Sequence, residues 1–152
     1  MGIREYPTQE LAAQPIGYWS GETYRTVVAR IRSDLALESL TQPGWWILNH
    51  IDGAPRSWTS AALTERLQPF DDQDTDFPAV FDDLAGRGWL AYDGDATMTL
   101  TPTGREGLER ARARSKTTSS QTLAGITTDE FVATLNVLRR IIDNLGGNSD
   151  IP

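Results

Sequence analysis

The stretch that most constrains the fold runs from Leu84 to Leu108 and places three elements within 25 residues. Apolar residues at helical spacing lead into Gly86–Gly88, where we expect a helix to end. Trp89–Tyr92 predicts a short strand, and the alternation of apolar and threonine residues in Ala96–Leu100 predicts a second strand. Between them, Asp93-Gly94 predicts a two-residue turn, because glycine tolerates the positive φ that such turns need.

The second strand leads directly into another helix. Pro102 cannot continue a strand but suits the first turn of a helix. Thr101 or Thr103 can cap this helix, and Thr103 has capping-box spacing to Glu106. A helix, a short hairpin and a helix in this order are typical of a winged helix.

Two short helices are expected before the hairpin. The segment Ser57–Leu67 predicts the first, with a Ser or Thr cap and Leu63 and Leu67 four residues apart. The second is predicted over Thr75–Arg87, because apolar residues recur there at i, i+3, i+4 and i+7. The fold class is therefore mainly α, a winged helix-turn-helix with a two-stranded β wing.

Amphipathic helices on both sides of this unit suggest a helical dimerisation region. We expect residues 1–152 to form a single domain, with the winged helix over 41–101 and dimerisation helices over 18–37 and 103–145. These outer helices carry more apolar surface than a winged helix of this size needs. Packing within the monomer alone is the alternative. The tail, residues 146–152, is expected to be disordered.

The composition limits the classes of function. The chain has no cysteine and one histidine, which excludes disulfides and a multi-histidine metal site within one chain. No apolar run is long enough to span a membrane, and the amino terminus lacks the features of a signal peptide, so we expect a cytoplasmic protein. No catalytic constellation is present: there is no phosphate-binding glycine loop and no Ser-His-acid spacing. We therefore expect no cofactor, no metal and no catalytic residues.

Three local motifs, in this order and spacing, resemble the MarR family of winged-helix regulators, named for multiple antibiotic resistance. LTQPGWWIL (Leu40–Leu48) is similar to the family's Leu-Thr-x-x-Gln-Trp-x-x-Leu, although Gln is absent before Trp45. LAGRGWL (Leu84–Leu90) resembles the Leu-x-x-x-Gly-Leu-Val end of the recognition helix. LTPTGREGL (Leu100–Leu108) resembles the family's Leu-Thr-x-x-Gly entry to its fifth helix. The resemblance covers roughly residues 18–145.

The resemblance implies a homodimer whose first, fifth and sixth helices intertwine, with the third and fourth helices and the wing facing DNA. It also implies a small aromatic or phenolic ligand between the dimerisation and DNA-binding parts. On these positions, the candidate DNA contacts are Thr59, Ser60, Thr64, Arg66, Thr75 and Arg87. The candidate ligand contacts are Tyr18, Trp19, Trp45, Trp46 and His50, for which plain core packing is the alternative.

The charge pattern departs from the family. Family wings are longer and carry an arginine near the tip, whereas here no basic residue occurs between Gly88 and Gly104. Residues 57–101 hold nine acidic and two basic residues, so the whole net charge of −7 lies in the segment that would face DNA. DNA affinity comes largely from cationic contacts to phosphate, and this surface should repel DNA unless Arg56, Arg105 or the amino-terminal arm compensates. Basic residues gather instead at Arg105, Arg110, Arg112, Arg114 and Lys116. They form either a solvated helix face with intrahelical pairs, or a site for a partner's acidic segment or an anion.

Two classes of function follow. The first is a ligand-responsive transcriptional regulator that binds double-stranded DNA, weakly by charge, as a homodimer. The alternative is a dimer of the same fold that has lost DNA binding. Such a dimer would act as a small-molecule-binding protein or cofactor-free enzyme, or as a DNA mimic that binds a basic protein.

Overall fold

The computed structural model describes residues 2–151 as seven α-helices, one short 3-10 helix and a two-stranded sheet. The elements are α1 (Thr8–Ala12), α2 (Ile16–Ala36), α3 (Gln42–Gly53), α4 (Ser60–Leu67), the 3-10 helix η1 (Gln68–Phe70), α5 (Phe77–Gly86), β1 (Leu90–Tyr92), β2 (Met98–Leu100), α6 (Pro102–Thr122) and α7 (Thr128–Asn144). The mainly helical fold class with a two-stranded wing is confirmed. Among the described helices, none is both long and apolar enough to cross a lipid bilayer.

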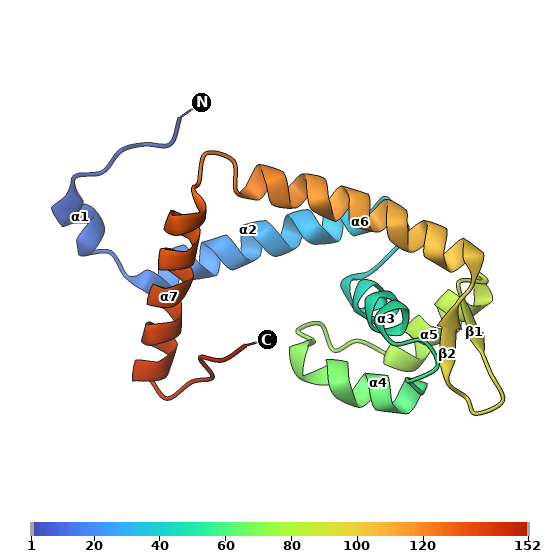
Figure 1. Ribbon diagram of the computed structural model, residues 1–152. Helices are drawn as coiled ribbons and strands as arrows, with labels where there is room; N and C mark the ends of the chain where they lie inside the picture. Colours follow the sequence, from blue (N-terminus) through green and yellow to red (C-terminus); the bar gives the residue numbers. More distant parts are fainter. Residues whose placement is uncertain (1, 152) are drawn as a thin grey trace. The chain divides into compact units, whose positions relative to one another are not determined.

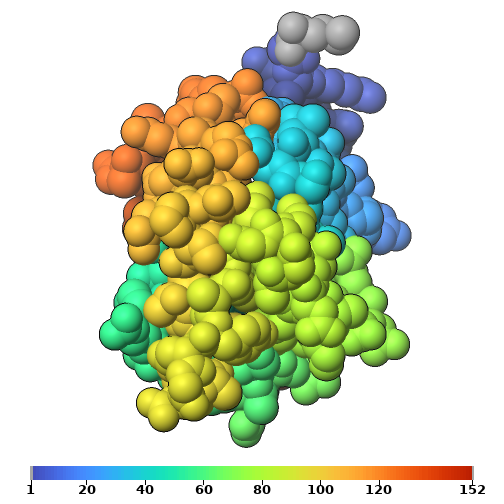
Figure 2. All heavy atoms as spheres, turned by 90° about the vertical axis from the view of Figure 1, so that its right-hand side faces the viewer, coloured from blue at the N-terminus to red at the C-terminus, as the bar shows by residue number. Residues whose placement is uncertain are grey.

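The chain divides into two compact units, residues 1–118 and 119–152. In the first unit, α2 runs beside α6, and α3, α4, α5 and the wing are grouped at the amino-terminal end of α6 (Figure 1). The wing projects past α5, as the space-filling view in Figure 2 shows in yellow and yellow-green. The second unit contains the end of α6 and all of α7.

The short helices begin where local side chains cap them. Thr41 accepts a hydrogen bond from the Gly44 amide at the start of α3, and Thr59 accepts one from the Ala62 amide at the start of α4. Asp76 caps α5 in the same way. Such caps satisfy backbone N–H groups that have no partner within the helix. Because Thr59 is the cap, α4 begins at Ser60 rather than at the predicted Ser57.

One apolar core joins these helices to the wing. It contains the side chains predicted from helical spacing in α5, since Phe77, Phe81 and Leu84 are all at most 2 % exposed. In α3, Ile47 is fully buried, whereas Trp46 lies half-buried at the edge of the core. The fully buried side chains of the core are Ile47, Leu48, Ile51, Leu63, Met98 and Leu108.

The wing is shorter than predicted, and its turn is of a different type. Leu90 pairs with Leu100 and Tyr92 with Met98 in an antiparallel register. The predicted two-residue turn at Asp93-Gly94 is wrong. The Asp93 amide donates to the Thr97 carbonyl, the Ala96 amide donates to the Asp93 carbonyl, and Ala96 has φ of 60°. This arrangement is a three-residue loop in which Ala96 adopts the left-handed conformation that glycine usually supplies.

Helix α6 packs directly on the end of the first strand. Of the two predicted caps, Thr101 rather than Thr103 caps α6, because it accepts from the Gly104 amide, and its hydroxyl donates to the Gly88 carbonyl. A Cβ atom at Gly104 would lie 2.1 Å from the Trp89 carbonyl oxygen. A Cβ at Gly107 would lie 2.3 Å from the Trp89 ring. Both glycines therefore allow the helix and the strand to approach closely.

Helix α7 belongs to the second unit and begins with a full capping box. Thr127 accepts from the Glu130 amide, and the Glu130 carboxylate accepts from the Thr127 amide. Its exposed apolar side chains are Phe131, Val132, Leu135 and Val137. In the tail, residues 146–151 form no helix or strand, and the Ser149 carbonyl accepts from Arg139 at 2.9 Å. Pro152 lies outside the described residues.

Candidate nucleic-acid interface and its charges

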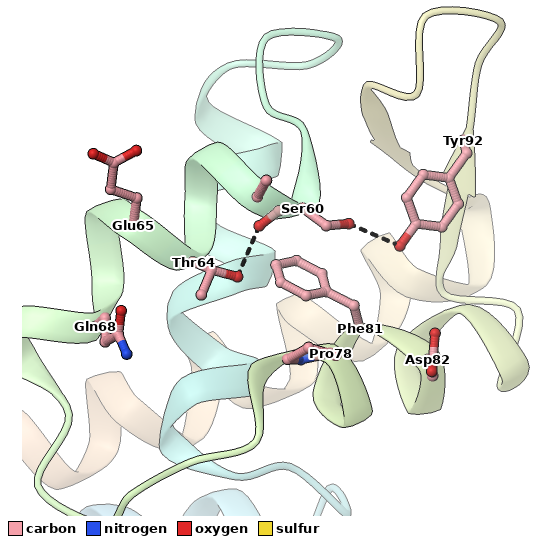
Figure 3. A pocket seen from close by; sticks show the side chains of 9 residues that line it. Ser60, Thr64, Glu65, Gln68, Pro78, Phe81, Asp82 and Tyr92 are labelled. Carbon is pink, nitrogen blue, oxygen red and sulfur yellow. Dashed lines mark hydrogen bonds between the residues drawn. The ribbon is translucent and has the colours of Figure 1, made fainter.

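The face that a winged helix presents to DNA is formed here by α4, α5 and the wing. Between these elements lies an open pocket of about 530 Å³ (Figure 3). The Phe81 ring lies at its centre, and the Tyr92 ring closes it from the wing. The carboxylates of Glu65 and Asp82 line the pocket as well. Apolar spacing predicted Phe81, but the sequence did not indicate Tyr92, because its partner Ser60 is 32 residues away.

Every hydroxyl group in the predicted set of DNA contacts is already engaged within the chain. Thr59 caps α4, and Thr64 donates to the Ser60 carbonyl at 2.8 Å. The Ser60 and Tyr92 hydroxyls are 3.2 Å apart and share a hydrogen bond. Thr75 donates its hydroxyl to the Asp71 carboxylate at 2.7 Å. Thr64 and Thr75 must give up an existing hydrogen bond before they can donate to phosphate or a base edge, whereas Thr59 only accepts and keeps its hydroxyl proton.

The two arginines of the set also have partners. Arg87 forms an ion pair with Asp83 at 3.0 Å, one turn back on α5. Its guanidinium lies 4.6 Å from the centre of the Trp89 ring, and its Nε is buried without a hydrogen-bond partner. Arg66 lies 5.8 Å from the centre of the Phe70 ring. Arg66 is thus the more accessible cation of this face, while the charge of Arg87 is compensated.

Several acidic residues of this segment hold loops and helix ends together. Asp71 accepts from the amide and hydroxyl of Thr75, and the Thr75 amide bond is the largest cause of its lowered pKa. Asp93 accepts from Thr97, whose hydroxyl bond lowers the pKa of Asp93, and the charge of Arg56 lowers it further. These neutral donors stabilise the ionised carboxylates without cancelling their charge.

Asp72 connects this segment to α2. Its carboxylate accepts from the Tyr24 hydroxyl and from Arg32 at 2.6 Å. The Tyr24 bond is the largest cause of its lowered pKa, and the same bond raises the pKa of Tyr24. In contrast, Glu65, Asp74, Asp82 and Asp95 have no side-chain hydrogen bond or ion pair among residues 2–151. Their charge faces solvent uncompensated.

The arginines of α6 are paired with acids elsewhere in the same chain. Arg110 and Arg114 both bind Glu38, at 2.9 and 2.7 Å, and the Arg110 bond is the largest cause of the lowered pKa of Glu38. Arg112 binds Asp52 at 2.9 Å. The predicted intrahelical pairing holds in part, because Arg112 also binds Glu109 at 2.8 Å, one turn back on α6, while Arg110 and Arg114 bind Glu38 instead.

The predicted aromatic ligand contacts lie on two helices. Tyr18 and Trp19 are in the first turn of α2 and are exposed, and the Trp19 indole donates to Gln14 at 2.6 Å. Trp45 and Trp46 are half-buried on α3. His50, also half-buried, lies with Nδ1 2.8 Å from the Trp46 carbonyl oxygen, so Nδ1 carries the proton.

The ring of His50 meets Trp58 edge-on, with centroids 5.9 Å apart. The structure therefore groups Trp46, His50 and Trp58, and it places Tyr18 and Trp19 at the far end of α2 from α3 (Figure 1). The ligand-binding role of the set stays a prediction. Within the described part of the chain, no three His, Asp or Glu side chains are grouped as a metal site.

Comparison with solved structures identifies the fold. The chain matches the PcaV transcriptional regulator of Streptomyces coelicolor with a TM-score of 0.70 and 20 % identity, over 89 % of this chain and all of that one. It matches the transcriptional repressor CouR with a TM-score of 0.67 and 23 % identity, over 91 % of this chain and 98 % of CouR.

A MarR family protein of Mycobacterium tuberculosis, solved in complex with DNA, matches with a TM-score of 0.64 and 22 % identity. The match covers 88 % of this chain and 99 % of that protein. The same protein has been solved in complex with p-aminosalicylic acid. No protein-family model matches the chain, and no curated protein matches its sequence significantly. The chain has the winged-helix fold of the MarR-family regulators, as the three sequence motifs indicated.

Proposed function

We propose that the chain is a homodimeric, ligand-responsive transcriptional regulator of the MarR type that acts in the cytoplasm. The observation that carries the proposal is the match of nearly the whole chain to regulators of this fold, one of which was solved on DNA. The proposal has three parts, namely a dimer, a DNA contact and a ligand, and each has its own support and test.

The dimer is supported by the apolar side of α7. Phe131 and Leu135, which lie four residues apart on this side, are 38 % and 42 % exposed, although a helix of this amphipathic pattern normally buries its apolar stripe. Burial against a second copy would remove this surface from water. Sedimentation equilibrium should therefore give about twice the chain mass of 16.8 kDa. A monomer at micromolar concentration would contradict this part.

The DNA contact is proposed for α4, α5 and the wing, through Thr59, Ser60, Thr64, Arg66, Thr75 and Arg87. With the hydroxyls engaged and Arg87 paired, only a few phosphates would be neutralised. We expect binding that is measurable near about 50 mM salt and lost near about 200 mM. Fluorescence anisotropy with a mixed-sequence duplex tests this, and no binding at the lower salt would overturn it.

The ligand is proposed to be a small aromatic acid that contacts Tyr18, Trp19, Trp45, Trp46 and His50. Support comes from these aromatic side chains and from the p-aminosalicylic acid complex of the tuberculosis protein. Three of the five residues are tryptophans, so binding should quench tryptophan fluorescence. Salicylate is the first compound to titrate. A Trp46→Phe variant should lose part of the quenching, whereas Trp89→Phe, in the wing, should keep it.

A second candidate function is favoured by the uncompensated acids Glu65, Asp82 and Asp95 on the DNA-facing side. A dimer that had lost DNA binding would act on a small molecule in the aromatic region or would mimic DNA toward a basic protein. Quenching by salicylate without any DNA binding at about 50 mM salt favours the first of these forms. Saturable binding of a basic protein such as a histone, abolished by Asp82→Asn and Glu65→Gln together, favours the second.

A further inference from the structure

A second pocket lies beside the wing, and none of its lining residues is among the proposed DNA and ligand contacts. It has a volume of about 470 Å³. The end of α3, the loop after it, β2 and the first turn of α6 all contribute to its wall. The residues that line it are Ile51, Asp52, Pro55, Arg56, Thr99, Leu100 and Arg105.

The lining contains two cations that no direct contact holds, although the charge of Arg56 also acts on Asp93 in the wing. Neither Arg56 nor Arg105 forms a side-chain hydrogen bond or an ion pair among residues 2–151. The single acid of the lining, Asp52, is already bound by Arg112 at 2.9 Å, and Arg112 is held in turn by Asn49 at 3.0 Å. The lining therefore has a surplus of positive charge, in a winged helix that is otherwise acidic.

The backbone holds Arg56 at this place in a conformation that arginine rarely adopts. Its φ is 60°, in the left-handed region that favours glycine. Its amide donates to the Met98 carbonyl at 3.0 Å, which attaches the loop to the wing. Glycine would form the same hydrogen bond at lower conformational cost. A strained arginine with an unpartnered guanidinium at the rim of a pocket indicates a binding role for its side chain.

Arg105 approaches the pocket from the first turn of α6, a helix of 21 residues. Its own amide donates to the Thr101 carbonyl at 2.9 Å, which fixes its position in that turn. The amino-terminal end of a helix carries partial positive charge, which adds to the charge of the guanidinium. Thr99 supplies a hydroxyl from β2. Two arginine forks and a hydroxyl suit an anion with several oxygen atoms.

We propose that this pocket binds a phosphate-type oxyanion, held by Arg56 and Arg105 with help from the Thr99 hydroxyl. The phosphate comes either from the backbone of duplex DNA or from a free phosphorylated small molecule. The site goes beyond the proposed function, because none of its residues belongs to the DNA or ligand contacts proposed above.

Titration of the full-length protein with inorganic phosphate at constant ionic strength tests the site. We expect the Nε–Hε NMR signals of Arg56 and Arg105 to shift with one saturable dissociation constant. Arg56→Gly and Arg105→Gln should each weaken binding at least tenfold. Arg25→Gln, an exposed charge-matched control on α2, should bind as the original protein does. Arg56→Gly should also melt no lower than the original protein, since glycine suits φ of 60°.

The proposal is overturned if inorganic phosphate shifts neither signal at millimolar concentration, or if both variants bind phosphate unchanged. These results do not depend on DNA binding, so a failure of the proposed function is seen separately. The source of the phosphate follows from a competition. If it is DNA, phosphate should displace a duplex at constant ionic strength, and Arg56→Gly should reduce the salt slope by about 1. If the phosphate belongs to a small molecule, neither added inorganic phosphate nor the Arg56→Gly substitution should change duplex binding.

Discussion

The winged-helix segment, residues 57–101, and helix α6 both carry many charges, but different partners compensate them. In α6, arginines bind carboxylates: Arg110 and Arg114 bind Glu38, and Arg112 binds Asp52. In the winged helix, Asp71 and Asp93 bind amides and hydroxyls instead. An ion pair cancels charge, whereas a capping bond stabilises the ionised group and leaves its charge in place.

This difference explains how a stable fold can keep a strongly acidic face. Asp76 caps a helix, and Asp71 and Asp93 hold loops together, so these three acids do not need basic partners to be stable in the fold. Arg110 and Arg114 of α6 are paired with Glu38, just after α2, and Arg112 with Asp52 of α3, so these three arginines do not offset the acidic face. The consequence is a MarR-type fold in which α4, α5 and the wing contribute few cations.

A substitution at the contact between α6 and Trp89, where the two regions meet, should cause the largest loss of stability. Gly107→Ala would place a Cβ about where the Trp89 ring lies, since the built distance is 2.3 Å. We expect a loss of about 3 kcal/mol in the free energy of unfolding, measured by urea denaturation. Gly86→Ala is the matched control, because nothing lies within 4 Å of its Cβ position and alanine favours helix. Equal midpoints for the two variants would show that Trp89 is not packed in this way.

Breaking the ion pairs of α6 should cause the second largest loss of stability. Glu38→Ala removes a carboxylate that is 9 % exposed and leaves Arg110 and Arg114 without it. We expect a loss of about 2 kcal/mol, because hydrogen bonds to charged groups are worth more than neutral ones. Glu22→Ala, which breaks the exposed pair with Arg25, should leave the urea midpoint unchanged. A midpoint for Glu38→Ala equal to that of the control would contradict the role given to this pair.

Acid should weaken the capping bonds of the winged helix. The pKa values of Asp71, Asp72 and Asp93 are lowered in the fold, so the unfolded chain binds more protons near pH 4. Stability should therefore be full above about pH 4.5 and should fall as the pH drops through the folded pKa values. Asp93→Asn keeps an oxygen acceptor for Thr97 but no longer titrates. Urea midpoints measured from pH 2 to 6 should therefore decrease less with falling pH in this variant than in the original protein. The same decrease in the variant would mean that Asp93 does not contribute to the loss of stability in acid.

Removing the charge of Asp82 should have the smallest effect on stability but should raise the affinity for DNA. It has no side-chain partner in the described structure and lines the pocket beside α4. Asp82→Asn should leave the melting temperature unchanged and raise DNA affinity about twofold at low salt, the size expected for one exposed charge at about 10 Å. Asp150→Asn, in the tail, removes the same charge elsewhere and should have no effect. Anisotropy titrations compare the two, and equal affinities would assign the effect to net charge alone.

Local patterns in the sequence predicted much of the fold. The cap at Thr101 follows from a threonine directly before a proline. The buried positions of α5 follow from helical spacing. The turn of the wing did not follow, because Ala96 rather than Gly94 adopts positive φ, and alanine gives no signal for it.

The candidate sites depended on contacts that the sequence does not display. Glu38 and Arg110 are 72 residues apart, so the pairing of α6 could not be read from spacing within the helix. The pocket at Arg56 and Arg105 is assembled from four elements. What the sequence did indicate is the charge of residues 57–101, because a sum of charges needs no contacts.

The salt dependence of DNA binding tests the central claim, that the winged helix contributes few cations to a DNA contact. The dimer should be titrated with a mixed-sequence duplex between about 30 and 200 mM salt, and the logarithm of the binding constant plotted against that of the salt concentration. We predict measurable binding at about 50 mM and a slope of about −3 or shallower, which corresponds to about three phosphates. A slope of about −6 or steeper, or no binding at about 50 mM, would contradict the account.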